Sequence, residues 1–254
     1  MYRLTNRTEH MIKFFRRFRQ KMLSKNKSSQ YLLYAIGEIV LVVIGILIAL
    51  SINNWNEERK IKSNAENYIN KIINDLSVDT LNIKALIVLS DTFETNISTY
   101  FDYYNSSDSL NIPIDSLIVN AREITARYMK YYPVNQSFKD MESSGNGNLL
   151  TDTQRDFLIA LNAKQEELGI IIDNYLETAI DEAKISLQLL GDPTNFYTKL
   201  NFKNSLERKT QGLLHIHLGI SARNNMYRYI ESRGKTIIKL SHEAIVLLKQ
   251  NKHD

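Results

Sequence analysis

Residues 31–52 read YLLYAIGEIVLVVIGILIALSI, an apolar run in which Glu38 is the one charged side chain. At 1.5 Å per residue, a helix of this length is about 33 Å long, which matches the hydrocarbon core of a bilayer. Its fourteen Leu, Ile and Val residues contribute about −4 to −8 kcal/mol to insertion, whereas one acidic group costs about 2.5–3.5 kcal/mol. The run is too long for a cleaved signal peptide. The stretch therefore predicts a transmembrane helix.

Charge on the two sides of this run predicts its orientation. Residues 1–30 hold nine Lys and Arg against one acid, Glu9, while residues 55–60 (WNEERK) are balanced. Positive segments stay in the cytoplasm, so we expect the C-terminal part in the periplasm and the chain in the inner membrane. Interfacial aromatic anchors are expected at Tyr31, Tyr34 and Trp55.

The basic arm before the run has its own pattern. Met11, Phe14, Phe15, Phe18 and Met22 recur at helical spacing, and the basic residues between them are Lys13, Arg16, Arg17, Arg19 and Lys21. This favours a short amphipathic helix lying on the anionic inner leaflet, with a partner-binding helix as the alternative. We expect no nucleic acid to bind here, because topology already explains the charge.

Residues 11–59 carry a resemblance. A basic MIKFFR start, a YAIGEI core followed by IGILIAL, and an NNWNEE exit resemble an uncharacterised family of small membrane proteins from Gram-negative bacteria. Residues 138–158 resemble a second segment of that family more loosely. The resemblance implies that Met11 is the usual start and that residues 1–10 are an upstream extension. It implies no activity.

Small and acidic residues within the predicted membrane helix suggest an association surface. Gly37, Glu38, Gly45 and Ala49 lie on one overlapping strip, and small residues let helix backbones approach closely. We expect self-association through this strip, with a neutral Glu38 bonding to a neighbouring helix. The alternatives are an ion-coupled stator-like subunit that uses Glu38, and a tolerated carboxyl that reaches the headgroups.

The rest of the chain has a helix period and clear helix ends. We predict an all-α fold: one N-terminal transmembrane helix, then an extracytoplasmic antiparallel bundle of about four helices. Residues 53–104 continue the membrane helix, with a break near Asn53 or Ser77 as the alternative. A shorter helix covers 114–130, and a short one ends at the glycine-rich turn 145–148. Long helices cover 152–190 and 203–250. The predicted parts are a cytoplasmic arm (1–30), the membrane helix (31–52), the long helix (53–104) and the remaining bundle (105–254).

No group of residues predicts chemistry. The chain has no cysteine, which excludes disulfides and thiolate chemistry. His215 and His217 are two apart, so they point to different helix faces and predict packing rather than a metal site. We expect the protein to have no enzymatic activity and to bind no cofactor. The favoured function is a membrane-anchored periplasmic interaction or scaffold protein, bound to anionic lipid and to its own copies or a membrane partner. The alternative is a periplasmic ligand-sensing module that acts through a membrane partner.

Overall fold

The computed structural model describes residues 16–17, 28–106, 111–124, 129–191 and 205–250. Its elements are the helices α2 (Ser28–Tyr104), α3 (Ile114–Ile124), α4 (Gln136–Ser143), α5 (Asp152–Leu190) and α7 (Leu206–Gln250), with a 3₁₀ turn η2 (Gly147–Leu149). The described residues contain helices and no strand, which confirms the predicted all-α class.

The chain divides into two compact units, residues 1–63 and 64–254, and the division falls inside α2. In the first unit, α2 shows no break near Asn53, and all side chains from 32 to 52 except that of Ala35 are exposed. Arg16 and Arg17 of the basic arm are exposed. Lys13, Arg19 and Lys21 lie outside the described residues, as does the side chain of Tyr31.

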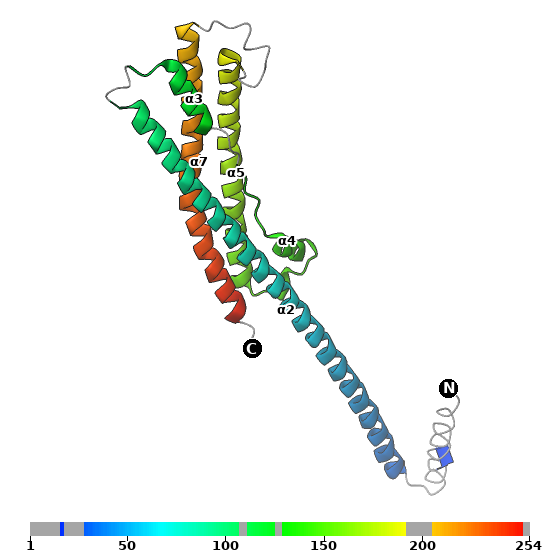
Figure 1. The fold of residues 1–254 in the computed structure, drawn as a ribbon. Helices are drawn as coiled ribbons and strands as arrows, with labels where there is room; N and C mark the ends of the chain where they lie inside the picture. The colour runs from blue at the N-terminus through cyan, green and yellow to red at the C-terminus, as the bar shows by residue number, and fades with distance from the viewer. Residues whose placement is uncertain (1–15, 18–27, 107–110, 125–128, 192–204, 251–254) are drawn as a thin grey trace, which may run out of the picture. The chain divides into compact units, whose positions relative to one another are not determined.

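In the second unit, α5 and α7 lie side by side and run in opposite directions (Figure 1). The Gln154 side-chain amide near the start of α5 donates to the Leu247 carbonyl near the end of α7 over 3.1 Å. At the other end of α5, Glu182 accepts from His215. Because these two long amphipathic helices pack along their length, each buries one apolar stripe against the other.

The part of α2 in this unit also runs opposite to α7. Ile83 packs at Gly234, and the Phe93 and Tyr227 rings stack with centroids 5.5 Å apart. Helices α2 and α5 therefore run in the same direction, and residues 105–151 return the chain from the end of one to the start of the other. The three long helices bury a common core of Ile72, Leu76, Ile83, Leu161, Leu168, Ile172, Ile220, Met226, Ile230 and Ile237.

Local signals fix the ends of α4 and α5 as predicted. Thr151 accepts from the Gln154 backbone N–H while the Gln154 side chain accepts from the Thr151 N–H, a complete capping box. Gly191 ends α5 with φ 77°, and Gly145 follows α4 with φ 75°. Glycine reaches this left-handed region without the steric cost that other residues have.

Two details of the predicted helices are wrong. The helix predicted for 114–130 is described only as far as Ile124, and it does not reach residue 130. Residues 129–135 form a non-helical segment, called the extended segment, in which the Tyr131 hydroxyl and the Val134 N–H both bond to Asp79. The apolar period of the sequence also predicts that Leu187 in the 152–190 helix and Leu214 and Leu218 in the 203–250 helix are buried, and this prediction is wrong. Leu187, Leu214 and Leu218 are exposed, whereas their neighbours Ser186, Leu213 and Ile216 are buried.

Candidate functional sites

The predicted membrane segment presents large exposed apolar side chains among the described residues. Leu33 and Leu41 are 74% and 72% exposed, and no atom lies within 4 Å of a Cβ built on Gly37 or Gly45. Glu38 and Ala49 lie on the same helix and are exposed. Trp55 and Tyr34, the expected interfacial anchors, are exposed as well. This surface is open to a lipid or to another helix.

A buried carboxylate lies at the centre of the second unit. Asp79 on α2 is 0% exposed. Its two oxygens accept from the Tyr131 hydroxyl at 3.0 and 2.9 Å, and they also accept from the Val134 N–H at 3.0 Å and the Gln165 side-chain amide at 2.7 Å. The carboxylate thus joins α2, the extended segment and α5. Burial of a charge is costly unless donors surround it, and three donors do so here.

Electrostatics around Asp79 favour a structural role. Burial raises the pKa of Asp79, and the hydrogen bonds from Val134, Gln165 and Tyr131 oppose that rise. Burial, followed by the adjacent Asp79 charge, raises the pKa of Tyr131 far above its ordinary value. The tyrosine therefore keeps its proton and donates it in a hydrogen bond. This arrangement holds the extended segment in place and supplies no activated nucleophile.

One signal for this site is present in the sequence. Asp79 falls on the face of α2 that buries Leu76 and Ile83, at helical spacing from both. A carboxyl on a core face calls for donors from elsewhere in the chain. Neither Asp79 nor its partners Tyr131 and Gln165 are among the candidate residues predicted from the sequence.

The two histidines contact different helices. His215 donates to Glu182 on α5 over 2.6 Å, while His217 Nε2 shares a hydrogen bond of 2.6 Å with the Tyr100 hydroxyl on α2. The Tyr104 ring meets the His217 ring edge-on, with centroids 4.7 Å apart. Burial lowers the pKa of His217 and raises that of Tyr100 to about 12. Both groups are neutral at pH 7 and act as packing groups.

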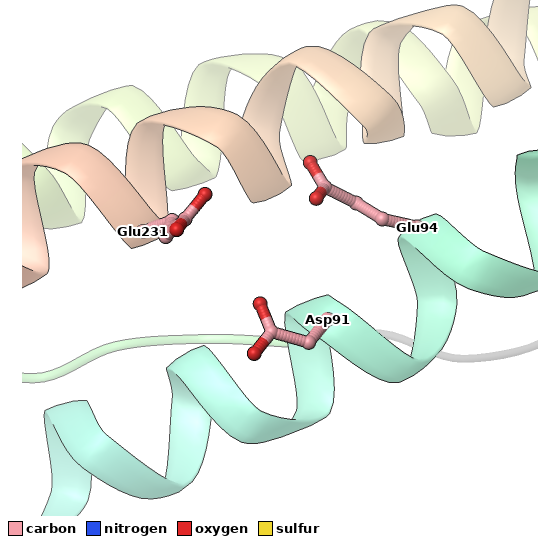
Figure 2. Close-up of side chains that lie close together, drawn as sticks. All are labelled: Asp91, Glu94 and Glu231. Atoms are coloured by element: carbon pink, nitrogen blue, oxygen red, sulfur yellow. The ribbon is translucent and has the colours of Figure 1, made fainter.

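Three carboxylates from two helices meet near the C-terminal end of α2 and the middle of α7. Figure 2 shows Asp91 and Glu94 on α2 and Glu231 on α7 pointing toward one another, with one oxygen of each within 4.8 Å of the others. Burial, then the charges of Glu231 and Asp91, raise the pKa of Glu94, whereas Arg228 lowers it. Carboxylate oxygens suit Ca²⁺ or Mg²⁺. Here, however, Lys235 pairs with Glu231 at 2.5 Å, so protein cations already offset the charge.

A shallow cleft opens on the surface shared by α5 and α7, and it has a volume of about 570 Å³. The rings of Tyr175 and Tyr229 lie on it with centroids 5.7 Å apart. Its other lining residues are polar or charged: Asn225, Arg228, Glu231 and Ser232. Such a lining offers aromatic faces and both signs of charge to a small molecule.

The described residues define an all-helical protein in which one helix, α2 near the N-terminus, is long and apolar enough to cross a membrane by length and composition. Its most apolar window has a mean hydropathy of 2.8 and no buried residue. Residues 38–186 match DUF6090, a family of unknown function, and the chain belongs to this family. This confirms the predicted membership of an uncharacterised family. No curated protein and no solved structure matches the chain.

Proposed function

We propose that this protein is a membrane-anchored interaction protein of the inner membrane of a Gram-negative bacterium. Residues 31–52 of α2 cross the bilayer, the basic arm stays on the cytoplasmic side, and the helical bundle stands in the periplasm as a scaffold for partners. The arm rests on anionic lipid. The absence of any assembled nucleophile, base and orienting group among the described residues is compatible with such a role.

One observation carries the anchoring: the large apolar side chains of residues 32–52 are exposed in the folded chain. Burying one Leu, Ile or Val is worth about 1.5–3 kcal/mol. Leaving fourteen of them in water costs about 20–40 kcal/mol, which exceeds the stability of an ordinary domain, about 5–15 kcal/mol. A bilayer covers such a surface without a protein partner.

Topology is tested with a reporter fused to Asp254 and with alkaline carbonate washing of membranes. We expect a reporter that works only in the periplasm to be active and the chain to stay in the membrane pellet. A reporter active in the cytosol, or a chain that carbonate releases, contradicts the anchoring.

We further propose that copies associate through the membrane strip Gly37, Glu38, Gly45 and Ala49. The open space around both glycines would let a second helix backbone approach closely. Gly45→Leu should lower the crosslinked dimer fraction in native membranes about tenfold, which corresponds to about 1.4 kcal/mol of packing. Val43→Leu, on another side of the same helix, is the matched control. Equal dimer fractions in the two variants contradict association through the strip.

The α5–α7 cleft favours ligand sensing as a second candidate function. Arg228 can pair with a carboxylate and the Tyr175 and Tyr229 rings can cover an apolar group, so amino acids and dipeptides are suitable probes. The test is a thermal shift of the detergent-solubilised chain against a set of these compounds. A rise in melting temperature that Arg228→Ala removes supports sensing. No shift with any probe, or a shift that survives the substitution, contradicts it.

A further inference from the structure

The outward face of α2 in the second unit carries a stripe with heptad spacing. Its members alternate in steps of three and four residues and all are exposed: Val78, Leu81, Ala85, Val88, Thr92, Thr95 and Thr99. They lie opposite the buried positions of the same helix, which include Leu76, Ile83 and Ile97. We call these seven residues the α2 stripe. Two periodic faces on one helix mean that α2 buries one of them in its own core and leaves the other open.

The chemistry of the α2 stripe suits burial. Leu81 and Val88 are 64% and 65% exposed. The hydroxyls of Thr92, Thr95 and Thr99 donate to carbonyls one turn earlier in the helix, at 3.1, 2.9 and 2.9 Å. These donors are therefore satisfied without water, and no member of the stripe carries a charge. Covering the stripe would leave no hydroxyl proton without an acceptor.

The outward face of α5 differs from this one. On α5 the exposed positions include Arg155, Lys164, Glu167, Asp173 and Glu177, as expected for a helix side that meets water. Between Ser77 and Thr99 the exposed side of α2 carries two charged residues, Lys84 and Asp91, and both lie on one flank of the stripe. A long uncharged stripe of this kind, apolar from Val78 to Val88 and made of threonines from Thr92 to Thr99, marks an interaction surface.

We infer that the α2 stripe packs against the same stripe of a second copy of this chain, with the two helices parallel. Steps of three and four residues are the pattern of a left-handed coiled coil, in which each core residue of a parallel pair meets its own counterpart. A dimer with two-fold symmetry uses the same surface patch on both copies. The inference rests on the proposed anchoring, because two copies inserted the same way in one membrane have the same orientation.

The charged residues beside the α2 stripe and the length of the stripe also favour a second copy of this chain as the partner. In a parallel pair the flanking Lys84 faces Leu89 of the second copy, and Asp91 faces Asn96 of the second copy, so no like charges are opposed. Residues 78–99 span three heptads, which is the short limit for a coiled coil. Anchoring in a common membrane raises the effective concentration to about the millimolar range. The contact therefore forms between membrane-held chains.

The chain has no cysteine, so single cysteines report this contact directly. Leu81→Cys, Val88→Cys and Thr95→Cys place a thiol on the α2 stripe, and Asn82→Cys and Ser98→Cys place one on exposed flanking positions of the same helix. Copper-phenanthroline is added to native membranes containing the full chain, and disulfide dimers are separated without reductant. A disulfide needs Cα atoms within about 7 Å, so we expect at least about fivefold more dimer from the stripe variants. Equal yields at stripe and flank, or no dimer at the stripe, overturn the inference.

Two further variants separate this inference from the proposed function and from other partners. Val88→Glu in the Thr95→Cys background should reduce the dimer at least about fivefold, whereas Ile170→Glu, at a similarly exposed position on α5, should leave it unchanged. Ala49→Cys reports the membrane strip. A dimer through Ala49→Cys without one at the stripe overturns this inference and leaves the proposed function standing. A stripe cysteine that crosslinks to a different protein instead of to itself overturns the choice of a second copy.

Discussion

Replacing Asp79 by leucine should strongly destabilise the helical unit formed by residues 64–254. The carboxylate accepts from three separate donors, the Tyr131 hydroxyl, the Val134 N–H and the Gln165 amide, at distances between 2.7 and 3.0 Å. Leucine has the same branched shape, with two larger methyl groups in place of the oxygens and no acceptor. The three donors would then have no acceptor at this position, and water would not replace it, because Asp79 has no exposed surface.

The expected loss follows from these contacts. Each buried donor left without an acceptor costs about 1–3 kcal/mol, so three cost about 3–9 kcal/mol. The substitution also removes a buried charge, and because burying an ion costs several kcal/mol, this offsets part of the loss from the unpaired donors. We expect a net loss of about 2–5 kcal/mol in unfolding free energy, out of about 5–15 kcal/mol for a typical domain. Tyr131→Phe removes one donor and keeps the other two, so it should cost about 1–2 kcal/mol.

The measurement is urea unfolding of the detergent-solubilised chain, followed by circular dichroism. Glu177→Leu, at an exposed position of α5, is the control for exchanging a carboxylate for leucine and should stay within about 0.5 kcal/mol of the wild type. If Asp79→Leu is no less stable than this control, the buried carboxylate does not join the three segments and the reasoning is refuted.

Three further predictions concern pH, packing and capping. Burial raises the pKa of Asp79 above the ordinary 3.8, so its protonated form adds stability at acid pH. As the pH rises above about 4, the unfolding free energy of the wild type should fall relative to that of Asp79→Asn, and an increase would contradict this. Gly234→Ala places a Cβ 2.8 Å from the Ile83 side chain and should lower the unfolding free energy by about 1–3 kcal/mol. Gly169→Ala, whose nearest atom is 3.5 Å away, should raise it by up to about 1 kcal/mol, and thermal melts compare the two. Thr151→Ala removes the capping box and should cost about 1 kcal/mol in the same melts.

Features encoded in neighbouring residues were predicted well. The ends of α5 depend on Thr151 with Gln154 at one end and on Gly191 at the other, and both devices lie within a few residues of the helix. The all-helical class follows from spacing along the chain. The contacts of His215 and His217 with separate helices likewise follow from their spacing of two residues.

Features that depend on distant residues were not predicted. The apolar period of a helix indicates that one of its faces is buried. The helices that pack against it decide on which residues that face is centred. On α7 this places Leu213 and Ile216 inside and Leu214 outside. The position of Asp79 on the core face of α2 is local, but its donors Tyr131 and Gln165 lie more than 50 residues away in the chain. The meeting of Asp91 and Glu94 with Glu231 depends on how α7 lies against α2, which no local pattern specifies.

Helix α7 has a consequence for biosynthesis. Its 45 residues leave the ribosome after α2 and α5, and they lie beyond the stretch that matches the family. Until they emerge, the faces of α2 and α5 that α7 covers stay exposed on the nascent chain, and exposed apolar side chains favour aggregation. A nonsense codon before α7 would therefore leave a polypeptide that cannot complete its fold and becomes a target for quality-control proteases.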